Sequence, residues 1–558
     1  MISGVSNATG ATFGYRTNNI NNKIMANGIG GSITITANLG NMTNTSGIGM
    51  SLLGNMNTTH GSITLVSNAC ITTSSASTVI RTGNSGSINV TGRNLDIKNP
   101  FITDAGDIVL TGDNGTFQAG SFKGVLFGTN SCLTTSGGNI AITGRGGAVA
   151  GSFGIEGWPC ITAGGNGNIT YTGYGCGSGY GMHTGGTIKS NTGQITFNGT
   201  SIRGNSRGVS LSGTITSNSG DINIIGVKGT GSDSAISIFN SAISTGGNAG
   251  IYISGVISNA TSGGGTAVTL EYTDTLSTSN GPIVITAVSN SSDSLFAFKS
   301  GGADNKIIAN GTGGSITITG NLTNVNNTSG TGFSLLGNMS TTGGAILINS
   351  DRVSIDTTAS VNATSTGNVT IQPTKANRSI SIGGSDSSST LGIDQSEFNK
   401  ITAANLSIGN TATSNISLSS SVSWTSNIFL YAGNSIAGTL SNGNRTLTQG
   451  SYTLTTTTGV IFTGATQKTL TASGVQFVSD SGFQNSGSVY TASGSVFVGY
   501  ILRPVLIKTF SNSLILLESS RIWILIATQG GAHELVYCRT HKRRARDCSS
   551  GTPIASES

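Results

Sequence analysis

The sequence predicts an all-β protein folded as a parallel β-solenoid, also called a β-helix, with an irregular C-terminal tail. Three observations predict it. The composition is rich in Gly and poor in charge, short alternating apolar runs recur after Gly, and a long segment is present twice. Repeats of this kind are typical of arrays in which each unit stacks on its neighbours.

The composition favours strands and argues against helices. Of 558 residues, 85 are Gly and 6 are Pro, and charged residues make up 9%, whereas about a quarter of an average chain is charged. The Gly residues separate β-branched runs such as GSITITANL (31–39) and GDINIIG (220–226), which are typical of strands. Because no stretch keeps apolar residues at every third or fourth position, amphipathic helices are not expected.

A long segment is duplicated. The sequence NKIMANGIGGSITITANLGNMTNTSGIGMSLLGNMNTTHG (22–61) returns without gaps, at an offset of 283, as NKIIANGTGGSITITGNLTNVNNTSGTGFSLLGNMSTTGG (305–344). Of the 45 positions from 22 to 66, 31 are identical. The full duplicated segments are 1–66 and 284–349, and uniform composition between them indicates one continuous array.

A shorter unit, Gly followed by an alternating apolar run, starts anew about every 20 to 33 residues. Examples are GSITLV at 61, GSINVTG at 86, GDIVLTG at 106, GNIAITG at 138 and GQITFNG at 193. One such strand cannot bury its apolar face alone, so successive units must stack, in roughly 17 to 22 coils. A β-propeller would need four strands per blade and a fixed signature, which does not recur.

Alternation within each run sets the core. Side chains of a strand point alternately to its two faces, so we expect Ile33, Ile35, Ile316 and Ile318 inside and the Thr residues between them outside. Gly and Asn at the corners are expected to supply the left-handed backbone positions that tight bends need. The scarcity of Pro leaves the ladder donors intact.

Two regions differ in composition. Residues 1–499 form the repeat array, and residues 500–558 form a non-repeat basic tail that we expect to be poorly ordered. The tail holds eight Lys or Arg against four Asp or Glu, so the array itself is near neutral. It lacks the basic stripe with interleaved aromatic residues that nucleic-acid binding needs.

The tail contains two suggestive features. Its KRRAR run (542–546) is compatible with a targeting signal or a phosphate-binding patch. A solvated, disordered chain end is the favoured interpretation. Its apolar run from 522 to 527 is too short to span a bilayer.

The chain begins within the array, since MISGVSN (1–7) aligns with VITAVSN (284–290). Residues 1–7 do not have the pattern of a signal peptide. We therefore expect a fragment whose export signal and first coils lie upstream.

The segment RSISIGGSDSSSTLGIDQSEFNKITAANLSIG (378–409) resembles one that recurs in filamentous haemagglutinin-like, β-strand-repeat exoproteins of Gram-negative bacteria. The run NISLSSSVSWTSNIFLYAGNSI (415–436) resembles their strand-Gly-strand repeats. The resemblance implies a right-handed parallel β-helix exported across the outer membrane and displayed at the cell surface for adhesion. It also implies an outer-membrane secretion partner for the full-length protein, and such proteins carry an N-terminal secretion domain, which we expect to lie upstream of residue 1.

The carboxylates do not predict an active site. Glu271 and Asp274 form the best local pair, but their odd separation sends the side chains to opposite faces of a strand. Val268, Leu270 and Tyr272 are expected inside, with Glu271 outside beside Thr269. Asp104 and Asp107 suit a turn, and Asp96 and Lys98 share a face on which they can pair weakly.

Three cysteines begin the same phrase: Cys70 in CITTS, Cys132 in CLTTS and Cys160 in CITAG, with Ala242 in the matching slot of SAISTGG. A slot that accepts Cys or Ala suits a small buried apolar residue. We expect free thiols in one inward slot on different coils. A bridge between Cys132 and Cys160, one coil apart, is the alternative.

Metal and cofactor chemistry has little support. His60 and His183 lie far apart in the sequence, and the duplicate of His60 is Gly343. His533, Cys538, His541 and Cys548 are close together in the tail, but their order fits no zinc-finger spacing. No catalytic, cofactor-binding or metal-ligating residue and no cofactor is therefore predicted.

The sequence favours a structural shaft segment of a secreted or surface-displayed bacterial adhesin and not an enzyme. Its expected partners are a host-cell or abiotic surface, with glycans among the ligands, and no nucleic acid. The alternative is a polysaccharide-acting β-helix lyase or hydrolase, which would need outward carboxylates clustered on neighbouring coils. A third hypothesis is a flat surface of Thr residues that binds ice. The uneven coil lengths argue against it, because such a surface needs a regular lattice.

Overall fold

The computed structural model shows a nearly all-β parallel β-solenoid of about 14 turns. The described residues are those of 1–558 outside the following ranges: 7–12, 41–46, 74–77, 114, 259–263, 325–326, 328, 434, 437–438, 442–445, 450, 457–459, 464–475, 480–496, 501–506, 511–512, 519–520, 528–532, 540–547 and 551–558. The chain forms two compact units, one of residues 1–346 and 354–362, the other of residues 347–353 and 363–558.

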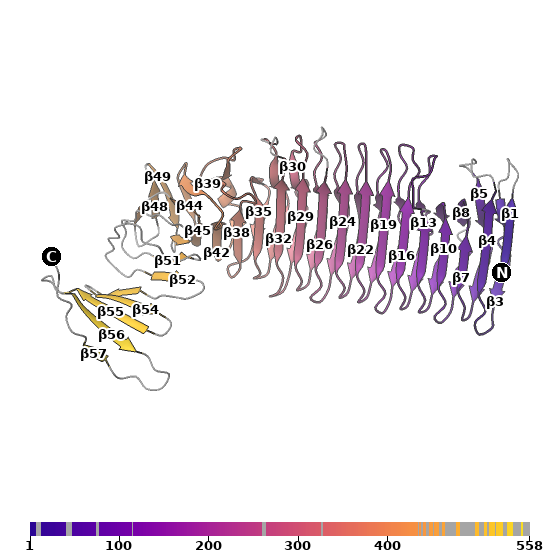
Figure 1. Ribbon diagram of the computed structural model, residues 1–558, viewed down its shortest axis with the longest axis horizontal. Helices are drawn as coiled ribbons and strands as arrows, with labels where there is room; N and C mark the ends of the chain where they lie inside the picture. Colours follow the sequence, from indigo (N-terminus) through magenta and orange to yellow (C-terminus); the bar gives the residue numbers. More distant parts are fainter. Residues whose placement is uncertain are drawn as a thin grey trace. The chain divides into compact units, whose positions relative to one another are not determined.

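Three parallel ladders, which we call A, B and C, build the first unit, and the chain visits them in that order on each turn. Ladder A stands out as the row of near-parallel arrows in Figure 1. Its strands are β1 (Ile2–Ser6), β4 (Ile33–Leu39), β7 (Ile63–Val66), β10 (Ile88–Gly92), β13 (Ile108–Gly112), β16 (Ile140–Arg145), β19 (Ile169–Gly175), β22 (Ile195–Ser201), β24 (Ile222–Lys228), β26 (Ile251–Ile257), β29 (Ile283–Ser289) and β32 (Ile316–Leu322).

Ladders B and C complete each turn, and two long strands bend to serve both. Ladder B holds β2 (Phe13–Arg16), β5 (Ile48–Leu52), β8 (Cys70–Thr73), β11 (Asn94–Ile97), β14 (Val125–Phe127), β17 (Ile155–Gly157), β20 (Met182–Thr184), the first parts of β23 (Val209–Ser217) and β25 (Ile236–Thr245), β27 (Val268–Glu271), β30 (Phe296–Ser300) and β33 (Thr331–Leu335). Ladder C holds β3 (Lys23–Ala26), β6 (Asn55–Thr58), β9 (Ile80–Thr82), β12 (Phe101–Thr103), β15 (Cys132–Thr135), β18 (Cys160–Ala163), β21 (Thr187–Ser190), the second parts of β23 and β25, β28 (Thr275–Thr278), β31 (Lys306–Ala309), β34 (Asn338–Thr341) and β37 (Ser360–Asn362).

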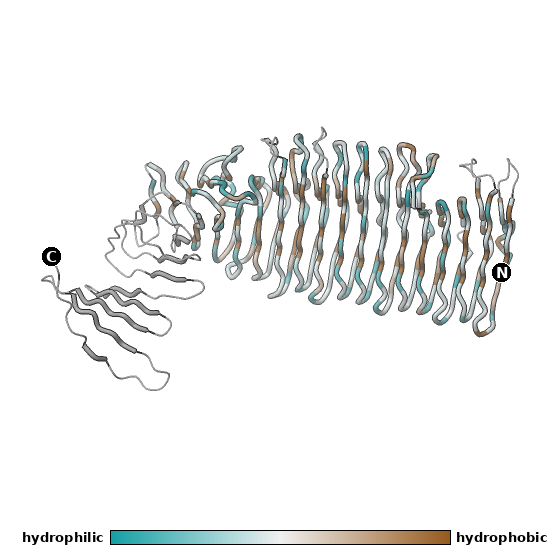
Figure 2. Tube along the Cα trace, in the orientation of Figure 1, coloured by the Kyte–Doolittle hydropathy of each residue, from teal (hydrophilic) through white to brown (hydrophobic). Residues whose placement is uncertain are grey.

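The core is as the alternation predicts. Ile35, Ile316 and Ile318 are fully buried and Ile33 is 6% exposed, while the Thr residues between them are only partly buried. Apolar residues follow the strands and polar residues the turns in Figure 2. Aromatic rings also stack between turns, as Tyr171 of β19 does on Phe197 of β22 at 5.0 Å between centroids.

The duplication is structural as well as sequential. Strand β1 pairs with β4 through Ile2 opposite Ile35, and β29 pairs with β32 through Ile285 opposite Ile318. The two copies therefore have the same register.

The number of turns is smaller than expected. About 14 turns form, not 17 to 22, because each turn holds three strands and three connections. Long connections, such as residues 146–154 between β16 and β17, add residues to a turn without adding a strand.

Glycine at the start of the ladder A strands is required mainly by close backbone contact. A Cβ on Gly193 would lie 2.0 Å from the carbonyl oxygen of Gly167, one turn earlier. Left-handed backbone occurs at neighbouring corner residues such as Gly165, with a φ of 51°, and Asn84, also 51°. The expected use of left-handed corners is therefore confirmed at these residues, but the Gly that opens each strand has another cause.

The second unit also contains parallel strands. Its described strands are β38 (Asn368–Gln372), β39 (Ser379–Ile382), β40 (Thr390–Ile393), β41 (Ile401–Thr402), β42 (Asn405–Gly409), β43 (Asn415–Leu418), β44 (Val422–Trp424), β45 (Asn427–Tyr431), β46 (Ser435–Ile436), β47 (Thr439–Ser441), β48 (Thr446–Gln449), β49 (Tyr452–Thr456), β50 (Val460–Thr463), β51 (Gln476–Ser479) and β52 (Phe497–Tyr500). Strands β35 (Ile346–Ser350) and β36 (Val353–Ile355) contain points where the two units divide.

Two further elements belong to the second unit. The short helix α1 (Gln395–Phe398) lies within residues 378–409 and begins with a capping box between Asp394 and Glu397. The sheet of β53 (Ile507–Phe510), β54 (Ser513–Glu518), β55 (Arg521–Ala527), β56 (His533–Arg539) and β57 (Cys548–Ser550) is antiparallel. The expected boundary at residue 499 stays a prediction.

Candidate functional site

The two carboxylates singled out in the sequence face different ways. Glu271 ends β27 and lies outside, where it accepts a hydrogen bond from the Ser237 hydroxyl at 2.8 Å. Asp274 is fully buried, and its Oδ1 accepts a hydrogen bond from the Ser241 backbone N–H at 2.8 Å. Burial raises the pKa of Asp274 to about 7. Asp274 thus serves the backbone of the preceding turn.

Tyr272 does not take the expected inward place. The strand ends at Glu271, Tyr272 has a φ of 63°, and its side chain is 64% exposed. The expectation is wrong because alternation stops with the strand. Val268 and Leu270 are buried as expected, but Thr269 is also buried, at 8% exposure.

The cysteines do not share one inward slot. Cys70 opens β8 in ladder B, whereas Cys132 and Cys160 lie opposite each other in ladder C. The inward residues are the next in each phrase, which are Ile71, Leu133 and Ile161, all fully buried. The inward expectation is therefore wrong, because the large residue takes the core side and alternation turns its Cys neighbour outward.

All three cysteines are free in the structure, as expected. Burial and a hydrogen bond to Cys160 raise the pKa of Cys132 to about 11. Ala242 does occupy the column of Cys132 and Cys160, since the register runs through Thr187 and Thr214 to Ala242. This column faces outward.

The remaining acidic residues named in the sequence have structural partners. Asp96 and Lys98 form the expected pair at 2.7 Å. At the corner, Asp104 accepts a hydrogen bond from the Asn84 N–H and Asp107 accepts one from the Asn139 N–H. Asp residues at such corners support the turn.

His60 is exposed at a turn. His541 and the KRRAR run lie outside the described residues, and the side chains of His533, Cys538 and Cys548 are likewise not described. Among the described residues, no group of three His, Cys, Asp or Glu could hold a metal ion.

The structure surrounds His183 with aromatic rings. We call Phe153, Trp158, Tyr180, His183 and Phe239 the aromatic patch. The His183 centroid lies 5.1 Å from that of Trp158, 5.6 Å from Tyr180, 6.0 Å from Phe239 and 6.1 Å from Phe153. These distances lie in the range where edge and face contacts of aromatic rings are favourable.

Stacking of turns brings these residues together. In ladder B, Glu156 of β17 lies opposite His183 of β20, and the column continues through Ser210 to Ser237. Phe153 and Tyr180 come from the connections that enter β17 and β20, and Trp158 follows β17. Residues from four successive turns thus meet on one outward face.

Charged side chains border the patch and are paired with each other. We call Lys123, Glu156, Arg207, Asp233 and Glu271 the charged rim. Lys123 pairs with Glu156, and Arg207 contacts Glu271 at 3.3 Å and Asp233 at 3.5 Å. Arg207 also donates to the Ser237 hydroxyl at 2.7 Å and lies 5.7 Å from the Tyr180 ring centroid. The rim is therefore held in place by its own contacts.

The structure determines the hydrogen bond of the Trp158 ring and the protonation of the His183 ring. The Trp158 indole N–H donates to the Ser212 hydroxyl at 2.8 Å, yet the residue is 50% exposed. Burial lowers the pKa of His183, so the ring is neutral at pH 7 and carries one donor and one acceptor nitrogen. Within the described part of the chain, neither nitrogen makes a hydrogen bond.

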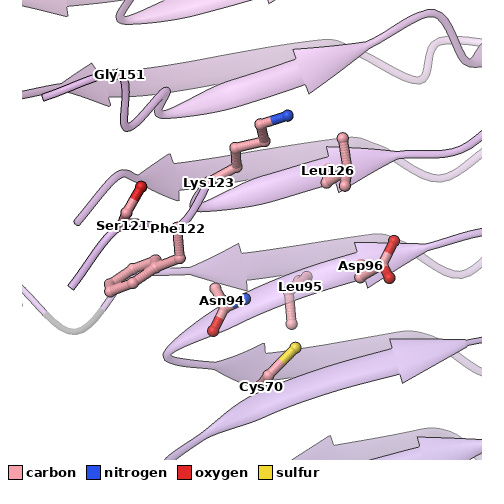
Figure 3. A pocket seen from close by; sticks show the side chains of 9 residues that line it. All are labelled: Cys70, Asn94, Leu95, Asp96, Ser121, Phe122, Lys123, Leu126 and Gly151. Atoms are coloured by element: carbon pink, nitrogen blue, oxygen red, sulfur yellow. The ribbon is translucent and has the colours of Figure 1, made fainter. Parts of the chain in front are cut away.

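A cavity of about 320 Å³ lies beside Lys123 of the charged rim, and Figure 3 shows the side chains that line it. It is lined by Cys70, Asn94, Leu95, Asp96, Ser121, Phe122, Lys123, Leu126 and Gly151. Lys123 belongs to both the cavity and the charged rim, and Phe122 lies against the Arg93 guanidinium at 5.0 Å. Burial raises the pKa of Cys70 to about 11, which makes it a poor nucleophile at neutral pH.

Sequence reasoning missed the patch. Read along the chain, His183 has no acidic neighbour, and Glu156 approaches it only through the register between turns. The available signal was the recurrence of Phe153 and Tyr180 at matching places in successive units. Each lies two residues before a ladder B strand, β17 or β20. The signal therefore appears when the ladder B strands are aligned, and not from the Gly-apolar runs of ladder A, whose distance to the next ladder B strand varies.

Comparison with protein-family models, curated proteins and solved structures gives no match. The fold is a β-solenoid of about 14 turns, and no family is assigned to the chain. No helix among the described residues is long and apolar enough to cross a membrane.

Proposed function

We propose that this chain is a shaft segment of a secreted or surface-displayed bacterial adhesin and attaches to host-cell or abiotic surfaces through its outward faces. The observation that carries the proposal is the unbroken stacking of ladders A, B and C, which presents rows of polar side chains on a regular support. Attachment over such a face sums many weak contacts.

The resemblance of residues 378–409 to haemagglutinin-like exoproteins supports the same assignment. That resemblance supports a location outside the bacterial cell, reached with the help of a secretion partner in the outer membrane that exports the full-length chain. It also favours binding over catalysis. These points of location and partnership rest on the resemblance alone.

A polysaccharide lyase or hydrolase is the second candidate, favoured by the acidic residues on the outward face of ladder B. Glu156, Asp233 and Glu271 lie there, but each forms an ion pair with Lys123 or Arg207. Acid/base catalysis needs a carboxyl group placed at the reacting bond, and these three carboxylates are each engaged by a cation of the charged rim. The pairing therefore favours binding.

The test couples attachment with turnover, using the full chain. Beads coated with the protein are applied to cultured epithelial cells and to plastic, and the soluble protein is incubated with a polysaccharide panel. We expect more retained beads than with an albumin coat and no release of reducing ends. Absence of retention on both surfaces, or turnover that a single Glu or Asp substitution abolishes, would contradict the proposal.

A further inference from the structure

We propose that the aromatic patch is a binding subsite for one sugar unit of a neutral glycan, which stacks against the exposed part of Trp158. The inference deepens the attachment function proposed above and rests on it, because the ligand must lie outside the chain. It specifies where on the solenoid recognition occurs and which chemical class is recognised.

The exposed aromatic surface is the first argument. Trp158 is 50% exposed although it contacts His183 and donates to Ser212. A ring held by such contacts loses little conformational freedom when a ligand binds. A sugar ring offers an apolar face of C–H groups, which pairs with an indole surface through burial and weak C–H contacts.

The polar groups beside the ring suit hydroxyls. The neutral His183 ring has a donor and an acceptor nitrogen without partners among the described residues. The Tyr180 hydroxyl likewise makes no hydrogen bond there. A sugar hydroxyl donates and accepts, so it can use all of these groups, whereas an aliphatic ligand can use none.

Charge argues for a neutral ligand. The rim holds three carboxylates, from Glu156, Asp233 and Glu271, against the two cations of Lys123 and Arg207. This surplus of negative charge opposes a nucleic acid or a sulfated glycan, both of which need cations on the protein. Paired charges can still exchange hydrogen bonds with neutral hydroxyls.

The neighbouring cavity provides room for an adjoining sugar unit. Its volume of about 320 Å³ is within the range of small-molecule sites, and it shares Lys123 with the rim. Polar side chains of Asn94, Asp96 and Ser121 line it beside Phe122 (Figure 3). A polymer that crosses from the patch to the cavity would contact both.

Affinity electrophoresis of the full chain tests the subsite. Native gels contain laminarin, mannan, dextran or galactan as neutral probes, and heparin or polyproline as probes of other classes. We expect at least one neutral polysaccharide to retard the protein. The variant Trp158→Ala should weaken that retardation at least about tenfold, as for a central aromatic contact.

The matched control is Tyr252→Ala. Tyr252 is 36% exposed in β26 of ladder A and is absent from the patch, so retardation should not change. Retardation by none of the neutral probes, by heparin or polyproline alone, or equally in the native protein and Trp158→Ala would overturn the subsite.

A second measurement avoids substitution. N-bromosuccinimide oxidation with peptide mapping follows Trp158 in the native protein, and a retarding polysaccharide should slow its oxidation at least about threefold. Unchanged oxidation would overturn the subsite. Bead retention read on the same preparations separates the two proposals: retention without glycan protection removes the subsite but keeps attachment.

Discussion

At the residue scale, the positions that open the ladder A strands require Gly because the backbones of successive turns lie too close together there for a Cβ. A Cβ on Gly138 would lie 2.1 Å from the Gly106 carbonyl oxygen, whereas a Cβ on Gly137 would have no neighbour nearer than 4.0 Å. Gly138→Ala must displace backbone and should lower the free energy of unfolding by about 1–3 kcal/mol. Gly137→Ala should change it by less than about 0.5 kcal/mol.

Urea unfolding followed by circular dichroism measures both variants. The two substitutions are chemically identical and adjacent, so effects on the unfolded chain largely cancel in the comparison. Equal stability of Gly138→Ala and Gly137→Ala would show that close stacking of the corner backbone is not what requires Gly.

Buried Asp274 makes stability depend on pH. Its pKa rises from an ordinary value of 3.8 to about 7 because burial disfavours the charged carboxylate. Between these values the folded protein holds a proton that the unfolded chain has lost. The free energy of unfolding should therefore fall as pH rises from about 4 to 7, by up to about 1.4 kcal/mol per pH unit.

Asp274→Asn should remove this part of the pH dependence. Asn fits the slot, because Asn305 does the equivalent task one turn later, where its Oδ1 accepts from the Asp274 N–H at 2.8 Å. Because Asp386 in the second unit also has its pKa raised, to about 6, the quantity to compare is the native-minus-variant difference between pH 4 and 7. A difference that is constant over this range would refute the titration of Asp274.

At the scale of the element, many ladder C strands close with a buried hydroxyl. The hydroxyl donates to the carbonyl of the next corner residue, as in these pairs: Thr103 to Gly106, Ser190 to Gly193, Thr245 to Ala249, Thr278 to Gly281 and Thr341 to Gly344. These hydroxyl residues are nearly inaccessible. Each strand thus ends with its corner carbonyl satisfied.

Thr278→Val keeps the side-chain shape of this closing residue but leaves the Gly281 carbonyl without its 2.6 Å partner. We expect a loss of about 1–3 kcal/mol in the free energy of unfolding. Thr286→Val makes the same change on the outward side of β29 and should cost little. Thermal and urea unfolding of the pair would contradict the account if the outward variant were the less stable one.

Alternation predicts an element's two faces but not where the element stops. It placed Ile33 and Ile35 inside, and it failed at Tyr272, where the strand has ended. The outward position of the cysteines could have been predicted from the sequence. Ile71 and Leu133 directly follow Cys70 and Cys132, and a large apolar residue outcompetes Cys for the core side.

At the scale of the whole molecule, the duplicated sequence predicts that strands pair in the same register in both copies. It predicts nothing about the turns between the copies. The pairings of β1 with β4 and of β29 with β32 repeat at the offset of 283. The aromatic patch depends on register where no copy exists. Glu156, His183 and Ser210 lie 27 residues apart in turn, and the hydrogen-bonded ladder sets them opposite one another. The units as a whole start 20 to 33 residues apart, so this constant spacing stands out only once the ladder B strands are aligned.

In-register stacking of turns is the central claim, since both the attachment faces and the patch depend on it. Cys132 and Cys160 report on it directly in the native protein, because they lie opposite each other in ladder C while Cys70 lies in ladder B. Parallel side chains keep opposed Cβ atoms wider apart than a disulfide prefers, so unreduced protein should show no bridge between them.

The deciding measurement is treatment of the reduced native protein with a short bis-alkylating reagent, followed by peptide mapping. The exposed Cys160 should react first and the second arm should then capture Cys132, whose pKa of about 11 slows its own attack. The account predicts a cross-link between Cys132 and Cys160 and none from Cys70 to either of them. A cross-link from Cys70 to either of them, or none between Cys132 and Cys160, would contradict the stacking.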